Sequence, residues 1–398
     1  MKTILIINDF NYTQGGASKV AIDSANIFSE KGYNVIFFSA VDKEGDFLNK
    51  NIQKICTNQE ESIKDKNILR GAINGIYNFR ASKKLNEVLK TLDPCSTVVH
   101  VHGWTKALSS SIYYVLFKNK FRTFVTIHDY FSACPNGGFY NYKTKKQCHL
   151  NPMSLKCILC NCDSRNYIIK LYRIIRLFVQ NRVVGFTKKM ENVIFISDFS
   201  ENILKEYFSK DANLYKIYNP IELDKNVKIN NFLNNEYLLY VGRISDEKGI
   251  DVFCENVIKS KFRSIVVGDG PKKVALEKKY PNIEFVGWKK PFEVKEYMRN
   301  ARCLIFPSKC YETMGLTVVE AMRYKIPIIA NKNTAASDFI DDGMNGFLYE
   351  NDNEIIDLIK RLDELDLKKY DYNMSRFEYD FYSKSLEKIY DCIDDVEE

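Results

Sequence analysis

Two glutamates eight positions apart, Glu312 and Glu320, lie in the segment YETMGLTVVEAM. We expect a turn at Met314-Gly315-Leu316 after the apolar run CLIFPS, and a helix from about residue 317 to 324. A carboxylate accepts two hydrogen bonds from adjacent hydroxyls, so it suits neutral ligands rich in OH groups. The turn would offer backbone N–H groups to an anion. The spacing alone also fits two ordinary surface charges.

Two cations follow another apolar run. Arg243 comes directly after YLLYVG, and Lys248 lies just beyond it in SDEKGID. In a doubly wound α/β fold, phosphates bind at the carboxyl ends of the strands. Arginine can hold two phosphate oxygens with its planar fork, and lysine contributes a point charge. The pattern therefore predicts a diphosphate site at Arg243 and Lys248.

Glycines follow several of the apolar runs. Gly15 and Gly16 separate the first expected strand from the first helix, but they do not form G-x-G-x-x-G, so the dinucleotide fingerprint is missing. Gly268 in VVGDGP and Gly287 in EFVGW also come directly after such runs. A glycine turn lets the backbone approach a ligand closely, although each turn alone is weak evidence.

The elements that must position these residues form two sets of short apolar runs. The first set is TILII, NVIFFSA, STVVHVHG, RTFVTIHD and NVIFIS; the second is EYLLYVGR, SIVVGDG, IEFVGW, CLIFPS and IPIIAN. Such runs, separated by helical segments, are typical of parallel sheets covered on both faces. The pattern restarts after Asn219-Pro220. We therefore expect α/β domains at 1–219 and 220–376, with a helix at 377–398 that packs back towards the first domain.

Composition supports a globular protein with different partners for its two halves. The chain has 398 residues, of which 45% are apolar and 27% charged. Residues 1–219 contain 31 Lys and Arg against 18 Asp and Glu, a balance of +13, and the remainder has a balance of −6. No run approaches the ~18 apolar residues of a membrane span, and MKTILIINDF is too short for a signal peptide. We expect a cytoplasmic protein with mostly reduced cysteines.

Together, these motifs resemble the retaining glycosyltransferases of family 4, which have the GT-B fold of two Rossmann-like domains facing each other across a cleft. The likeness rests on GlyGly after the first strand, VGRISDEKG, VVGDGP, FVGW and ETMGLTVVEAM, and it covers most of the chain. It implies that Arg243 and Lys248 hold the diphosphate of a sugar nucleotide. It also implies that Glu320 accepts from the ribose and Glu312 from the donor sugar, with the Gly315 and Leu316 N–H groups facing the phosphate or sugar.

The resemblance also implies a reaction. His128 in TIHD matches a histidine that lies by the donor sugar in such enzymes, whereas alone it would be a strand-end histidine. Met314 departs from the family, where many members have Phe, and this change conserves volume. No divalent metal is expected, because the two cations and the turn would neutralise the departing diphosphate. We expect retention by same-face attack, with the leaving phosphate taking the acceptor's proton.

Five cysteines cluster between 134 and 162, in a segment that contains KCILCNCD. In a reduced compartment, this C-x-x-C pattern suggests structural zinc or a loop of unligated cysteines. The predicted ligands are Cys134, Cys148, Cys157 and Cys160, with Cys162 or His149 as substitutes. A cysteine-bearing insert after the His-Asp pair also resembles a subset of polysaccharide transferases. Because it follows His128-Asp129, it should overhang the acceptor side of the cleft.

A basic, apolar helix is expected from about 165 to 189. Residues 164–189 contain seven Lys and Arg and no acid, and Lys170, Arg173 and Arg176 share one broad face. Such a helix can lie on an anionic membrane surface, here the inner face of the membrane. It can equally be a core helix with a solvated basic stripe.

The sequence therefore favours a hexosyltransferase that moves a sugar from a nucleotide diphosphate sugar to a growing, lipid-linked cell-surface glycan. One alternative is a nucleotide-sugar epimerase of the same fold, which would give no reason for the basic helix and the cysteine insert. The other is a zinc-containing nucleic-acid-binding protein, which would leave Glu312 and Glu320 unexplained. We expect no nucleic-acid partner.

Overall fold

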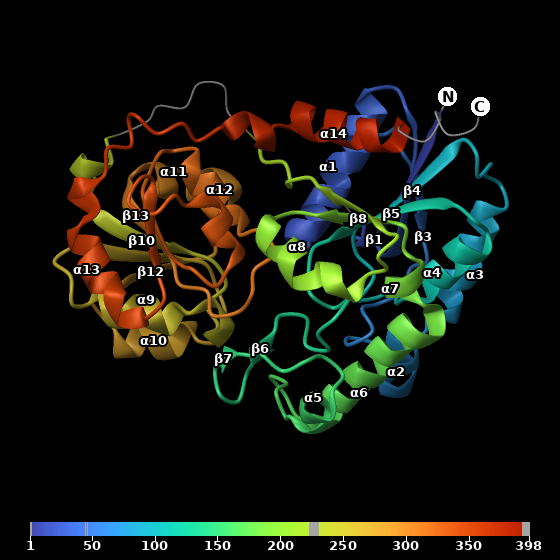
Figure 1. Cartoon of the computed structure of the whole chain (residues 1–398), viewed down its shortest axis with the longest axis horizontal. Coiled ribbons are helices and arrows are strands. Elements are labelled where there is room, and N and C mark those ends of the chain that lie inside the picture. The colour runs from blue at the N-terminus through green and yellow to red at the C-terminus, as the bar shows by residue number, and fades with distance from the viewer. Residues whose placement is uncertain (1, 44, 46, 223–230, 392–398) are drawn as a thin grey trace.

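The computed structural model describes residues 2–43, 45, 47–222 and 231–391. It contains two separate parallel sheets with helices around each, joined by one connection after residue 216 and by a helix that returns at the C-terminal end (Figure 1). The predicted α/β class with two doubly wound sheets is confirmed. Residues 392–398 of the predicted last helix lie outside the described residues.

The first sheet has seven parallel strands in the order β3-β2-β1-β4-β5-β8-β9. Its strands are β1 (Thr3–Phe10), β2 (Asn34–Val41), β3 (Gln53–Cys56), β4 (Thr97–Val101), β5 (Arg122–Ile127), β8 (Asn192–Phe195) and β9 (Asn213–Lys216). The helices around it are α1 (Gly16–Glu30), α2 (Ile68–Ile76), α3 (Phe79–Leu89), α4 (Ser111–Lys118), α6 (Tyr167–Phe178), α7 (Phe186–Lys189) and α8 (Asp198–Leu204).

The second sheet has six parallel strands in the order β12-β11-β10-β13-β14-β15. Its strands are β10 (Tyr237–Val241), β11 (Arg263–Val267), β12 (Glu284–Gly287), β13 (Ala301–Phe306), β14 (Ile328–Asn331) and β15 (Gly346–Tyr349). The helices around it are α9 (Ile250–Val257), α10 (Lys273–Lys279), α11 (Pro291–Arg299), α12 (Leu316–Met322) and α13 (Ile355–Lys360).

Both faces of the first sheet are buried, which explains its continuous apolar runs. Along β1, Ile4 and Ile6 point into one core with residues of α1, while Leu5 and Ile7 point into the opposite core with residues of α3 and α4. Successive side chains of a strand alternate between faces, so a strand covered on both sides must be apolar throughout. The cores lie on either side of the sheet and leave its carboxyl edge free for ligands.

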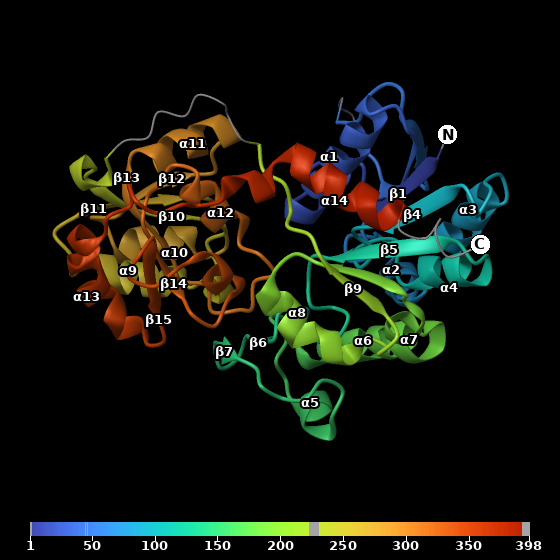
Figure 2. The same ribbon diagram turned by 45° about the horizontal axis from the view of Figure 1, so that its top comes forward.

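The C-terminal helix α14 (Tyr379–Asp391) packs on the first sheet's domain, beside α1 (Figures 1 and 2). Its buried side chains include Tyr382, Leu386, Ile389 and Tyr390, whereas Phe381 of the predicted stripe is exposed. The Tyr390 hydroxyl contacts His100 Nδ1 at 2.6 Å. The first and last described elements, β1 and α14, therefore lie on the same domain.

The cysteine-bearing insert projects from the end of β5 and reaches the other domain. It contains the hairpin β6 (Tyr140–Asn141) and β7 (Lys146–Gln147), followed by the short helix α5 (Leu155–Leu159). Gln147 donates to the Asn333 carbonyl at 2.9 Å, and Lys145 pairs with Asp246 at 3.1 Å. The insert thus bridges the two domains at one end of the space between them (Figure 2).

Helix α6 turns its basic positions towards the protein, which is the reverse of the orientation expected for a core helix with a solvated basic stripe. Lys170 is only 1% exposed, and Arg173 forms an ion pair with the buried Asp163 at 3.1 Å. Arg176 donates to the Thr105 carbonyl and lies over the Phe131 ring. The basic positions turn inward because these partners are available there. Within the described ranges, no helix combines the length and apolar character needed to cross a bilayer.

Candidate functional site

A pocket of about 320 Å³ between the two sheets, here called the central pocket, gathers most of the predicted site residues. Its walls come from residues that follow β1, β5, β8, β10 and β13, so the carboxyl edges of both sheets meet there. The predicted residues in its lining are Gly16, His128, Arg243, Lys248, Glu312, Met314, Gly315 and Leu316.

A close ion pair in the central pocket joins Lys248 to Glu312. Lys248 Nζ lies 2.5 Å from Glu312 Oε1, and the Ser308 hydroxyl donates to the same oxygen at 2.7 Å. Burial disfavours charge on Lys248, but the Glu312 carboxylate and the nearby Cys310 raise its pKa above the ordinary value. Lys248 therefore stays protonated and positively charged. Arg243, on the loop after β10, is exposed in the same pocket.

Glu320 lies in a neighbouring pocket, also of about 320 Å³, here called the Glu320 pocket. This pocket shares Val241 and Leu316 with the central pocket, and Trp288 and Pro291 form part of its apolar wall. Desolvation raises the pKa of the Glu320 carboxyl, while Lys19, Lys295 and Arg323 act in the opposite direction. The two glutamates therefore occupy adjoining pockets. The predicted helix after Gly315 is present, and it runs over Leu316–Met322.

His128 is part of a row of histidines that the sequence interpretation did not identify. His128 Nε2 lies 3.1 Å from His102 Nδ1, and the His102 ring lies against His100 with 4.1 Å between centroids and the ring planes tilted by 35°. Burial lowers the pKa of both His100 and His128 to about 3, so both rings are neutral at physiological pH. The contact with His102 fixes the orientation of His128. The HVH spacing in STVVHVHG was the available signal.

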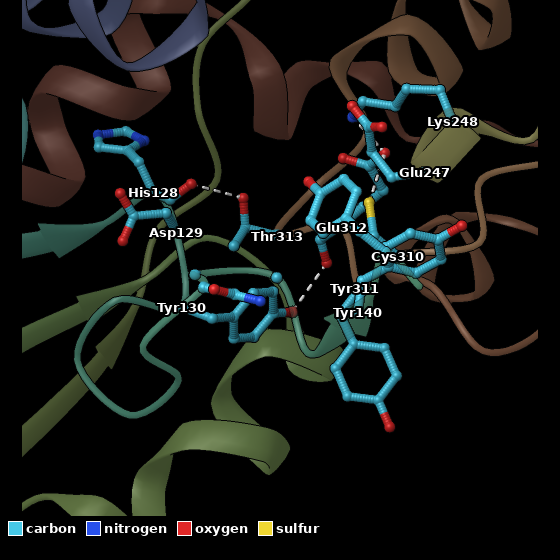
Figure 3. A pocket seen from close by; sticks show the side chains of 14 residues that line it. His128, Asp129, Tyr130, Tyr140, Glu247, Lys248, Cys310, Tyr311, Glu312 and Thr313 are labelled. Atoms are coloured by element: carbon cyan, nitrogen blue, oxygen red, sulfur yellow. Dashed lines mark hydrogen bonds and ion pairs between the residues drawn. The ribbon is translucent and has the colours of Figure 1, made fainter. Parts of the chain in front are cut away.

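A third pocket of about 200 Å³, here called the insert pocket, lies between His128, the cysteine insert and Glu312 (Figure 3). Two hydrogen bonds cross between the domains beside it. Tyr130 donates from its hydroxyl to the Glu312 carbonyl at 2.9 Å, and Thr313 donates to the His128 carbonyl at 3.0 Å. The loop after β5 is thereby fixed against the loop before α12.

Asp129 lines the insert pocket and was not among the predicted site residues. Burial raises the pKa of its carboxyl from 3.8 to about 6, although the Phe131 N–H donates to it at 2.9 Å and Arg176 opposes the rise. A carboxylate at this depth can accept a hydrogen bond from a ligand hydroxyl. Its position directly after His128 could have suggested it.

Three of the predicted glycines are not among the described residues that line the central, Glu320 and insert pockets. They are Gly15, Gly268 and Gly287. A Cβ at Gly268 would lie 1.9 Å from the Gly242 carbonyl oxygen, and Gly287 has a φ of 75°. Close strand-end packing and a left-handed turn therefore account for these two glycines. Their role in ligand binding stays a prediction.

The clustered cysteines converge on one small pocket. Cys134, Cys148, Cys157, Cys160 and Cys162 line it together with Lys170. Its volume is about 10 Å³, and Lys170 Nζ lies 3.7 Å from Cys157 Sγ. Among the described residues no group of three or more His, Cys, Asp or Glu could hold a metal ion. Zinc therefore stays a prediction.

Metal analysis of the purified protein tests it. A structural zinc site predicts about one zinc per chain, lost when Cys157 and Cys160 are both replaced by Ser. The double variant Cys254→Ser with Cys303→Ser serves as the matched control and should keep the metal. A zinc content under about half per chain in the unchanged protein contradicts the site.

Replacement of Asp129 by Asn should raise stability at pH 8 by about 1–2 kcal/mol, allowing for solvent in the pocket. Above pH 6 the carboxyl is ionised in both states, and burial penalises the folded one. As the pH falls from 6 to 4 the folded state becomes protonated and the gain disappears. Urea unfolding at several pH values measures this, with the exposed Asp211→Asn as control. A gain that is independent of pH would contradict the proposed burial cost.

Comparison with known proteins finds relatives for part of the chain. Residues 235–365 match the family model described as "Glycosyl transferases group 1". An uncharacterized 41.2 kDa protein of the cps region of Klebsiella pneumoniae is 31% identical over 36% of this chain and 44% of its own length. The alpha-monoglucosyldiacylglycerol synthase of Streptococcus pneumoniae is 30% identical over 48% of this chain and 49% of its own length. The chain thus spans about half the length of these relatives.

Among solved structures, Anabaena HepE in complex with UDP and glucose superposes with a TM-score of 0.65, at 16% identity. That match covers 99% of this chain and 100% of the other, so the likeness of fold extends over both domains. The chain therefore has the GT-B fold, and its residues 235–365 match the glycosyl transferases group 1 family.

Proposed function

We propose that the protein is a glycosyltransferase that moves a hexose from a nucleotide diphosphate sugar to a growing, lipid-linked cell-surface glycan. The observation that carries this proposal is the central pocket, where Lys248 and Arg243 lie beside Glu312 and His128 at the meeting edges of the two sheets. Two cations suit a diphosphate, and a carboxylate beside a neutral imidazole suits sugar hydroxyls.

The donor would extend across the two adjoining pockets. Its base would lie against the apolar wall of the Glu320 pocket, and its ribose hydroxyls would donate to Glu320. The diphosphate would then meet Arg243 and Lys248, near the Gly315 and Leu316 backbone, where the two pockets join. The sugar would lie between Glu312 and His128.

In the proposed reaction the bond between the sugar C1 and the diphosphate oxygen breaks, and a bond forms from the acceptor oxygen to C1. The acceptor's proton passes to the departing phosphate on the same face, so the anomeric configuration is retained. Lys248 and Arg243 stabilise the charge that develops on the diphosphate, in the place of a divalent metal. His128 is neutral at physiological pH, so it would contact the sugar as a hydrogen-bonding group and not as a cation.

The acceptor would enter from the insert pocket, where Asp129 can accept from one of its hydroxyls. A lipid-linked acceptor is supported by the name of the Streptococcus pneumoniae relative, which indicates a glycolipid product. The capsule-region relative supports a surface glycan. The protein would then work at the inner face of the membrane.

A thermal-shift screen across nucleotide diphosphate sugars tests the donor site. The true donor should stabilise the protein by about 2.7 kcal/mol at a hundredfold excess over its Kd. Arg243→Ala and Glu320→Ala should lose most of this shift, because each removes a direct contact.

The surface variants Arg263→Ala and Glu364→Ala are the matched controls, and they should keep the full shift. Loss of the shift in the controls, or its persistence in both pocket variants, would refute the donor placement. Consumption of the donor with no acceptor and a changed sugar as product would favour an epimerase instead.

A further inference from the structure

Helix α6 presents a continuous apolar stripe to solvent. Ile168, Leu171, Ile175 and Phe178 are all exposed, and their spacing of three and four residues places them along one side of the helix. Ile168 is 76% and Ile175 52% exposed, whereas Lys170 is 1% exposed. This orientation is the reverse of that expected for a surface helix in water. Burial of the stripe against an apolar partner would therefore be favourable.

Helix α2 shows the same reversal beside it. Its two buried residues are Gly71 and Gly75, one helical turn apart. A Cβ at Gly75 would lie 1.9 Å from the Tyr172 hydroxyl of α6, so the glycines allow α2 to pack closely on its neighbours. The large side chains of α2 point outward instead, with Ile68 86% and Leu69 71% exposed.

The short helix α5 extends the same surface. Leu155 and Leu159 are exposed, and Tyr167 at the start of α6 donates to the Ile158 carbonyl of α5 at 3.0 Å. In Figure 1, α5, α6 and α2 all lie along the lower margin of the N-terminal half. We call the exposed apolar side chains of these three helices the apolar face. Exposed apolar surface gathered in this way marks an interaction site.

The charges around the apolar face are mostly positive. Residues 66–84 contain five Lys and Arg and no acid, although Asp65 directly before them pairs with Arg70, and residues 154–190 contain a single acid, Asp163. Asp163 is fully buried and paired with Arg173. Lys66, Lys156 and Arg182 are exposed at or next to the ends of the three helices. A surface with apolar side chains and basic surroundings complements a bilayer that carries anionic headgroups.

We propose that α2, α5 and α6 together dock the protein on an anionic lipid bilayer, with the apolar side chains in the headgroup region. This inference rests on the proposed function for its purpose, because a docked face would present a lipid-linked acceptor to the cleft. Arg173 of α6 donates to Asn136, which lines the insert pocket, at 3.3 Å. The docking face and the acceptor side of the cleft are thus joined by one contact.

Co-sedimentation of the full chain with vesicles tests the proposal. The protein should bind vesicles of phosphatidylcholine with phosphatidylglycerol, and bind much less to phosphatidylcholine alone or at high salt. Ile168→Ser with Ile175→Ser should lower the partition coefficient about tenfold or more, and so should Ile68→Ser with Leu69→Ser. Ile258→Ser with Val274→Ser, on equally exposed apolar residues of the other domain, is the matched control and should bind like the unchanged protein.

Equal binding by the face variants, or no binding by the unchanged protein, overturns the proposal. Self-association that the face variants abolish, without vesicle binding, would make the surface an interface between two copies instead. The thermal shift caused by nucleoside diphosphates, measured on the same proteins without vesicles, separates this inference from the donor site. Vesicle binding without any nucleotide shift would refute the proposed function alone, and the reverse result would refute the docking face alone.

Discussion

Two hydrogen bonds across the cleft, Tyr130 to the Glu312 carbonyl and Thr313 to the His128 carbonyl, fix the loop after β5 against the loop before α12. Both loops start at the carboxyl edge of a parallel sheet, where side chains are free of the cores. Because main-chain atoms accept these bonds, they fix the backbone at Glu312 and His128. The side chains then make their own contacts, Glu312 with Lys248 and His128 with His102. His128, Glu312 and Thr313 line both the central pocket and the insert pocket, so the two pockets share this junction.

The charges of the site follow from this arrangement. The Glu312 carboxylate lies beside Lys248 and holds it as a cation, in a place where burial alone would favour the neutral amine. Burial keeps His128 neutral, and it leaves Asp129 close to its titration point near pH 6. The cations therefore lie on the side of the second sheet, while the uncharged ring and the titrating carboxyl lie on the first. That division suits a ligand with a charged diphosphate at one end and hydroxyls at the other.

Most of the strands and part of the site could be predicted from the sequence, and the features that could not be predicted have physical reasons. The central strands were predicted because they are buried on both faces and are apolar throughout. The edge strands β3, β9 and β15 were missed, since QKIC and NLYK are half-exposed and GFLY begins with glycine, which is depleted in strands. The position of Arg243 and Lys248 at the end of a strand followed from the rule of carboxyl edges, whereas their meeting with Glu312 and His128 was implied by the family resemblance. The orientation of α6 did not, because its inward basic residues depend on Asp163, Thr105 and Phe131, which periodicity cannot place.

The central claim is that Lys248 stabilises the departing diphosphate rather than only binding the donor. The direct test is steady-state kinetics of Lys248→Met with the donor found by thermal shift, with the exposed Lys279→Met as control. The account predicts that kcat falls about 10²–10³-fold, because the lost cation acts where charge develops during bond cleavage. An unchanged kcat with only a raised KM would contradict it.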